Sequence, residues 1–295
     1  MEYKRKKNTK RKREVQRNRA LLILGMLLMV FLAITIYEVK SHKEASEETK
    51  KENKTTAKKI EVQTNEQEDK RKKLPLEERK KLAKEAAASY EHSEDFLWML
   101  DTNDDTIDLV EDYETKKDEI PPETIGEDFV QGQIPILYQW DERWGYTEYN
   151  STILARSGCG PTALSMVLTY LNNDPTITPV KVAKYSTEMG YTDEEHGTTW
   201  ELMKDAPMHW GVSVKEGSPS DEEWIKNMLS SGSPIIASLG PGDFTTNGHF
   251  IVLTAYEDGY LTVHDPFRSV NTEKKWKYTD IYPQMKATWA FTKGN

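Results

Sequence analysis

The sequence predicts an α+β fold in which an antiparallel sheet packs against a helix that carries a candidate nucleophile, preceded by an N-terminal membrane helix. Three observations favour this fold. In the C-terminal half, helical patterns come first and consecutive strand patterns follow, an order typical of α+β domains. Seven of the eight tryptophans lie after residue 129, so the packed core is expected there. A run of eighteen uncharged residues lies close to the N-terminus.

That uncharged run, residues 20–37, would span about 27 Å as a helix, close to the hydrocarbon thickness of a bilayer. Residues 1–19 carry ten Lys/Arg and two acidic residues, a charge of +8. Because cationic flanks stay on the cytoplasmic side, residues 1–19 are expected to form a cytoplasmic tail and the later part of the chain to lie outside the cell membrane. A removable signal peptide is the alternative, but no small-x-small cleavage site follows the run.

The segment after the predicted membrane helix changes character twice. Residues 38–73 mix Lys and Glu and contain no aromatic residue, which predicts a disordered or partly helical tether. As a flexible chain it would have a root-mean-square span of roughly 30 to 35 Å. Residues 74–129 are predicted to form a helical prefix. Its first helix is expected over residues 76–100, and a second short helix over residues 107–113 follows the turn and cap residues at 102–105.

Residues 130–295 have the right length for one compact domain. They carry thirteen Lys/Arg and twenty acidic residues, and no basic stripe interleaved with aromatic residues, so nucleic acid is not expected as a ligand. Periodicity and turn residues predict a first strand over 133–138, helices over 161–171, 181–189 and 221–229, and strands over 234–239, 249–256, 260–264 and 287–291. Ser220 is expected to cap the helix over 221–229.

Cys159, the only cysteine of the chain, directly precedes the predicted helix over 161–171. Pro161 suits the first helical position. A thiol at this place faces unpaired backbone N–H groups and the positive end of the helix dipole, which favour the thiolate and hence a nucleophile. The alternative is a small buried apolar residue. With one cysteine, an internal disulfide is excluded.

His249 is the candidate base, because it follows the turn-forming pair at 247–248 and opens a predicted strand. If Tyr256 pairs with Tyr260 across a three-residue loop, Asp265 on the next strand lies diagonal to His249 on the same face. A register change of one residue would separate the two side chains. The alternatives are a core histidine for His249 and an ordinary turn former for Asp265 before proline.

Four ordered motifs resemble a known family. They are PILYQWD at 135–141, SGCGPT at 157–162, GHF at 248–250 and HDP at 264–266. Together they are similar to the papain-like cysteine peptidases related to the double-glycine leader peptidase domains of bacteriocin exporters. The resemblance implies Cys159 as nucleophile, His249 as base, Asp265 as the group that orients the base, and Gln139 as a side-chain donor to the oxyanion. In contrast to the exporters, one predicted membrane span takes the place of a transporter.

The sequence therefore predicts a membrane-anchored, extracytoplasmic cysteine peptidase that acts on a peptide or protein substrate and is expected to be a monomer. No cofactor or metal is expected, because no second histidine at ligand spacing accompanies the acidic residues before His196. Two alternatives stay open. The same triad is compatible with a cell-wall peptide amidase or an acyl or peptidyl transferase, and the fold alone is compatible with a non-catalytic anchored binding module.

Overall fold

The structure is a computed structural model that describes residues 70–193 and 197–294, together with Met26, Met29, Thr35, Lys40 and Lys43. The chain divides into two compact units, Met1–Leu74 and Pro75–Asn295. In the first unit the five isolated residues are helical.

Most of the predicted membrane helix over 20–37 and of the tether over 38–73 lies outside the described residues. Within the described part of the chain, no helix is long and apolar enough to cross a membrane.

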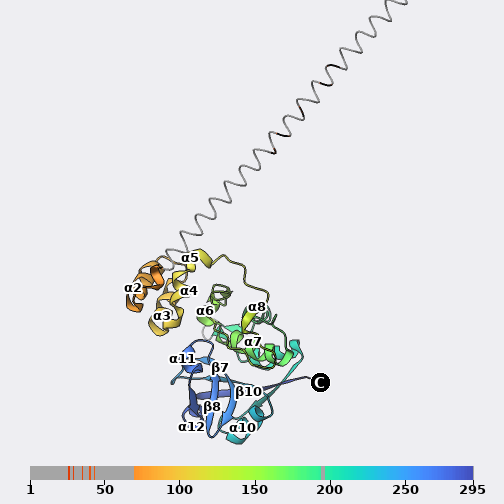
Figure 1. The fold of residues 1–295 in the computed structure, drawn as a ribbon. Coiled ribbons are helices and arrows are strands. Elements are labelled where there is room, and N and C mark those ends of the chain that lie inside the picture. Colours follow the sequence, from red (N-terminus) through yellow and green to blue (C-terminus); the bar gives the residue numbers. More distant parts are fainter. Residues whose placement is uncertain are drawn as a thin grey trace, which may run out of the picture. The chain divides into compact units, whose positions relative to one another are not determined.

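The second unit is built on one six-stranded antiparallel sheet, which confirms the predicted α+β class (Figure 1). Its strand order is β5-β10-β6-β7-β8-β9. The bounds are β5 Val212–Gly217, β10 Met285–Lys293, β6 Ile235–Leu239, β7 His249–Glu257, β8 Tyr260–His264 and β9 Lys275–Lys277. The predicted strands over 234–239, 249–256, 260–264 and 287–291 are present, whereas β5 and β9 were not foreseen.

Helices cover both faces of the sheet (Figure 1). Helix α7, Cys159–Asn172, shares one apolar core cluster with Phe250 and Val252 of β7. Helix α10, Glu222–Ser230, shares another with Ile251 and Leu253. Because side chains alternate along a strand, β7 is buried on both faces and reads as a continuous apolar run. The sheet is therefore the middle of three layers.

The remaining elements are short. The helices are α6 Leu154–Ser157, α8 Pro179–Glu188, α9 Glu201–Lys204, α11 Ser269–Thr272 and α12 Tyr278–Ile281, with 3₁₀ turns η2 Gly126–Asp128, η3 Ala206–Trp210 and η4 Tyr282–Gln284. Two two-stranded hairpins are formed by β1 Glu148–Tyr149 with β2 Thr152–Ile153, and by β3 Thr192–Asp193 with β4 Gly197–Thr198.

Helix α7 begins at Cys159, two residues earlier than the sequence predicts. Pro161 occupies its third position, where the missing N–H would have no partner inside the helix. The helix start is tightly packed, since a Cβ on Gly160 would lie 2.7 Å from Thr198 Cγ2. Only glycine fits at this contact, so Gly160 allows β4 to pack closely against the helix start that carries the candidate nucleophile.

The hairpin between β7 and β8 differs from its prediction at the turn, but farther along the strands it has the predicted register. Glu257, not Tyr256, pairs with Tyr260, and the loop has two residues, Asp258 and Gly259, both with positive φ of 51° and 81°. Such a loop is a favoured hairpin turn because its twist matches that of the strands. A bulge between Leu253 and Ala255 then shifts the register by one residue. Beyond the bulge Val252 pairs with His264, which is the predicted register.

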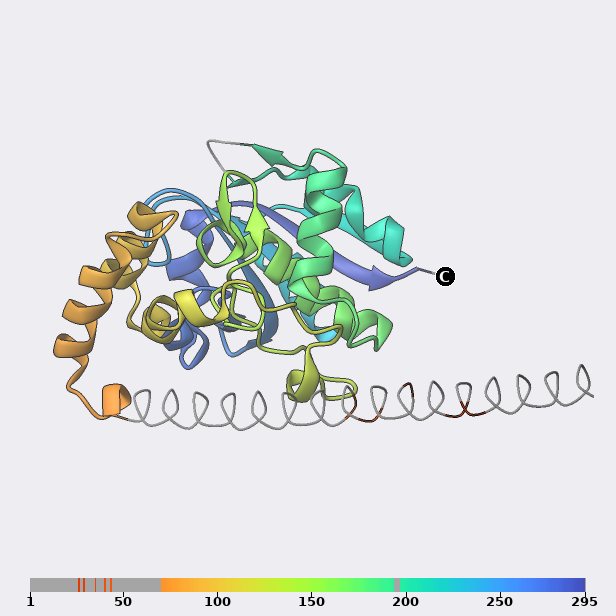
Figure 2. The ribbon, with the colours of Figure 1, turned by 90° about the horizontal axis from the view of Figure 1, so that it is seen from above.

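The helical prefix differs in detail from its prediction. Two helices, α2 Leu76–Ala87 and α3 Ser93–Thr102, replace the single helix expected over 76–100, and His92 between them has a positive φ of 57°. The buried side chains of α2 are Ala83 and Ala87, whereas Leu82 is exposed. Next come η1 Asp104–Thr106, α4 Ile107–Glu111 and α5 Tyr113–Lys116. Figure 2 shows α2 at the edge of the unit, away from the C-terminal strand.

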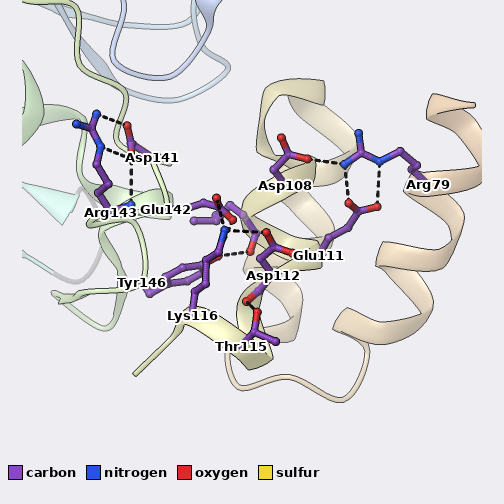
Figure 3. Close-up of polar contacts among 11 residues, drawn as sticks. Arg79, Asp108, Glu111, Asp112, Thr115, Lys116, Asp141, Glu142, Arg143 and Tyr146 are labelled. Atoms are coloured by element: carbon purple, nitrogen blue, oxygen red, sulfur yellow. Dashed lines mark hydrogen bonds and ion pairs between the residues drawn. The ribbon is translucent and has the colours of Figure 1, made fainter. Parts of the chain in front are cut away.

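Charged side chains hold the prefix together and attach it to the later chain (Figure 3). Arg79 of α2 forms ion pairs with Asp108 and Glu111 of α4. Lys116 of α5 bonds Asp112 at 2.9 Å and Glu142 at 2.8 Å. The second contact crosses from the prefix to the segment after Gln139, so these helices belong to the same folded unit as the sheet.

Two further predictions need correction. Residues 133–138 do not form a strand; Pro135 lacks an N–H, and the nearby Gln139 N–H makes a single bond to Pro266 O at 2.8 Å. The helix α10 is capped by Asp221, whose side chain accepts a bond from Trp224 N, and not by Ser220. A carboxylate there also complements the positive helix end.

Candidate active site

Cys159 is the first residue of α7 and is half-buried against the main apolar cluster. The short helix α6 ends two residues before it, and Gly158 separates the two helices. The first backbone N–H groups of a helix have no partner within it, so they surround the thiol as possible donors. This is the placement that the sequence predicts for a nucleophile.

His249 and Asp265 are in direct contact. His249 Nε2 lies 2.7 Å from Asp265 Oδ1, and the two side chains are 8% and 0% exposed. The diagonal placement expected from the hairpin therefore brings the two residues together. The contact forms because the bulge in β7 restores the register lost at the two-residue turn.

The Asp265 carboxylate accepts three more hydrogen bonds. Oδ1 accepts from the backbone N–H of Phe267 at 2.8 Å and of Arg268 at 3.2 Å, and Oδ2 accepts from Asn271 Nδ2 at 2.7 Å. Asn271 lies in α11 and is buried. Sequence reasoning missed it. A polar residue six positions after an aspartate is not a recognisable motif. The two side chains meet only because the fold turns α11 back onto the carboxylate.

The charges of the pair stabilise each other. Burial lowers the pKa of His249, but the Asp265 charge and hydrogen bonds with Asp265 and Cys159 outweigh it and raise that pKa to about 10. Burial raises the pKa of Asp265, yet His249 and the bonds from Asn271 and Phe267 lower it overall. The imidazole is thus held as a cation at neutral pH. Since Nε2 bonds Asp265, Nδ1 is the ring nitrogen left for the thiol of Cys159.

Gln139 is buried and bonds both the helix before Cys159 and the residue after Asp265. Its Nε2 donates to Ala155 O at 2.7 Å, and its backbone N–H donates to Pro266 O. Ala155 lies in α6, just before the nucleophile, and Pro266 directly follows Asp265. The amide nitrogen carries a second hydrogen, and Oε1 accepts no bond from any described residue. One N–H of this amide is therefore not used in the bond to Ala155.

The other histidines of this region lie elsewhere. His264 Nδ1 lies 3.1 Å from Pro135 O, and burial lowers the pKa of this side chain. His196 lies outside the described residues. No group of three or more His, Cys, Asp or Glu side chains in the described ranges is arranged to hold a metal ion.

The sequence profile of the Peptidase C39-like family matches residues 131–294, more than half of the chain. A comparison with curated proteins found no match.

Among solved structures, the chain is similar to one described as a C39-like peptidase from Bacillus anthracis, with 14% identity and a TM-score of 0.38 over 57% of this chain and 98% of that one. It is also similar to the peptidase domain of Streptococcus ComA, a bifunctional ABC transporter, with 14% identity and a TM-score of 0.37 over 46% and 91%. A third is a double glycine motif protease from an AMS/PCAT transporter in complex with the leader peptide, with 19% identity and a TM-score of 0.33 over 59% and 98%.

The family match spans the four motifs at 135–141, 157–162, 248–250 and 264–266, and therefore also Cys159, His249 and Asp265. The predicted relationship to papain-like peptidases of this group is confirmed. The chain belongs to the Peptidase C39-like family and is a cysteine peptidase.

Proposed function

We propose that Cys159, His249, Asp265 and Gln139 hydrolyse a peptide bond through an acyl-enzyme thioester. The observation that carries this proposal is the 2.7 Å contact of His249 with Asp265, together with the interaction of Cys159 with the same imidazole, inside the region matched by the family. A nucleophile, a base in contact with it and a third group that orients the base are the parts that nucleophilic catalysis requires.

The first half of the reaction forms the thioester. The reaction starts from the Cys159 thiolate beside the protonated imidazole of His249, whose charge Asp265 stabilises. Cys159 Sγ attacks the carbonyl carbon, and the oxyanion accepts hydrogen bonds from the Cys159 backbone N–H and the second hydrogen of Gln139 Nε2. The tetrahedral intermediate then collapses, the C–N bond breaks, and His249 gives its proton to the leaving amine.

The second half returns the enzyme to its starting state. His249, now neutral, takes a proton from a water molecule as its oxygen attacks the thioester carbonyl carbon. The same two N–H groups bind the second oxyanion. When the C–S bond breaks, the acid product leaves and Cys159 departs as a thiolate beside the protonated imidazole. Asp265 stays ionised throughout, because its four hydrogen bonds stabilise the charged form.

We further propose that residues 20–37 anchor the enzyme in the cell membrane, with residues 1–19 in the cytoplasm and the peptidase unit outside. The support is the charge of +8 before an uncharged run long enough to span a bilayer. Protease added to intact spheroplasts should remove the peptidase unit and spare the basic tail. Protection of the peptidase unit would contradict this topology.

The test of the hydrolytic function compares full-length wild type with the variants Cys159→Ala and His249→Ala on a mixed peptide library, with released amines as the readout. We expect each variant to lose the release of amines, and the double variant to be scarcely worse, since residues that act as a unit are not additive. Asp243→Asn, an exposed carboxylate outside the triad, is the matched control. Full activity of Cys159→Ala would exclude the proposed nucleophile.

A further inference from the structure

The helical prefix contacts the loop that carries Asp265, although the prefix precedes the residues matched by the family. Asp105 of η1 accepts two hydrogen bonds through Oδ2, from Ser269 N at 3.0 Å and from Ser269 Oγ at 2.7 Å. Ser269 is the first residue of α11. A carboxylate at this place satisfies an N–H group that the short helix leaves without an internal partner.

Helix α11 in turn holds Asp265. Asn271 donates to Asp265 Oδ2, and Thr272 Oγ1 accepts the backbone N–H of Asp265 at 2.9 Å. Asp105 therefore fixes the beginning of the four-residue helix that fixes the carboxylate. A displacement of α11 would reach His249 through a single intervening residue, Asp265.

Neighbouring contacts restrain the same loop from outside. Asn103 Nδ2 donates to Phe267 O, and Arg268 Nη2 donates to Thr102 O at 3.0 Å. The backbone N–H groups of Phe267 and Arg268 face the other way and donate to Asp265. Thr102, Asn103 and Asp105 thus hold the outer side of the turn whose inner side binds the carboxylate.

The prefix also reaches the nucleophile side. Asp95 of α3 forms an ion pair with Arg156 of α6 at 3.1 Å. The Arg156 guanidinium lies 3.9 Å from the ring centroid of Trp98, and the same ring stacks on Phe267 at 5.4 Å. Arg156 precedes Cys159 by three residues. One segment of the prefix therefore contacts both the helix that precedes Cys159 and the loop that follows Asp265.

We propose that the segment 95–105 positions the triad, and that Asp105 is a positioning residue that acts on His249 through α11 and Asp265. This inference rests on the hydrolytic function proposed above. It predicts that loss of the Asp105 carboxylate weakens the Asp265 contact with His249, because the angle and distance of a hydrogen bond decide its strength. The imidazolium is then less stable, and the Cys159 thiol reacts less readily at low pH.

The test uses the full chain and two adjacent aspartates. Asp105→Ala removes the acceptor of both Ser269 bonds. Asp104→Ala is the matched control, because Asp104 is exposed and its side chain pairs with Lys80 of α2 at 2.7 Å, within the prefix. Iodoacetamide alkylation reports on Cys159 alone, since the chain has one cysteine. Melting temperature and amine release are measured on the same samples.

We expect Asp105→Ala to slow alkylation at pH 6 and to move its pH profile toward that of His249→Ala, with a loss of turnover of about tenfold to a hundredfold. Asp104→Ala should match wild type in both readouts. Ser269→Ala, which keeps the backbone bond to Asp105, should shift the pH profile less and in the same direction. It takes the place of Asp105→Ala as the test variant if Asp105→Ala does not fold.

A lowered melting temperature with an unchanged alkylation profile would overturn the inference, because it would make Asp105 a structural residue only. Equal shifts in Asp104→Ala and Asp105→Ala would overturn it as well. The two proposals fail differently. If Cys159→Ala keeps its activity, the hydrolytic function fails; if Cys159→Ala is inactive while Asp105→Ala keeps the wild-type profile, only the positioning inference fails.

Discussion

Asp265→Asn tests the electrostatics of the site because it replaces the charge and keeps nearly the same shape. In the wild type, burial lowers the pKa of His249, while Asp265 and Cys159 raise it to about 10. Without the carboxylate charge, the burial effect remains, so we expect the pKa of His249 to fall below its ordinary value of about 6.5. The rise from 6.5 to about 10 corresponds to about 5 kcal/mol at about 1.4 kcal/mol per pKa unit.

The measurement is an NMR titration of the His249 imidazole in labelled protein. Wild type should stay protonated through pH 8, whereas Asp265→Asn should be neutral at pH 7. Turnover of Asp265→Asn at pH 7 should fall together with the fraction of His249 that is protonated. Asp243→Asn, which changes an exposed aspartate bonded to Gln284, is the control and should titrate as wild type. An imidazole in Asp265→Asn that still titrates above pH 9 would refute the reasoning, because another group would then supply the charge.

Three further predictions concern turnover and stability. Gln139→Ala should lower turnover by roughly a hundredfold or more with little effect on the alkylation of Cys159, because it removes an oxyanion donor; steady-state rates within twofold of wild type would remove Gln139 from the mechanism. Gly160→Ala should destabilise the fold by about 1 to 3 kcal/mol in urea unfolding, since its Cβ would lie 2.7 Å from Thr198 Cγ2; an unchanged midpoint would show that β4 moves aside freely. The raised pKa of His249 gives stability that is fully present below pH 6.5 and is lost as pH rises toward 10; His249→Ala should lack this part of the pH dependence, and parallel stability curves for the two proteins would contradict the assignment.

The sequence predicted those features in which a chemical motif coincides with the residue pattern of a helix or strand. The motif SGCGPT located the helix start to within two residues, and the buried strand that begins at His249 was found by its continuous apolar run. The α+β class followed from the order of helices and strands. These features depend on neighbouring residues, so a single chain reveals them.

Features that depend on distant contacts were missed or misplaced. The turn at Asp258 and Gly259 was one residue shorter than predicted, and the bulge that restores the register has no sequence signature of its own. The prefix helix ended at Ala87, and a second helix began after His92, whose backbone is left-handed. Asn271 and Asp105 became relevant only once the fold brought α11 to the Asp265 carboxylate and η1 to the beginning of α11.

The most direct test of the account measures the rate of iodoacetamide alkylation of Cys159 against pH in wild type and in His249→Ala. The single cysteine makes the mass of the intact protein a complete readout. The account predicts fast alkylation of wild type well below pH 8.5, near which an ordinary thiol ionises, and a shift of the variant to the profile of an ordinary thiol. Superimposable profiles with the midpoint of a free thiol in both proteins would contradict the claim that Cys159 and His249 act as one unit.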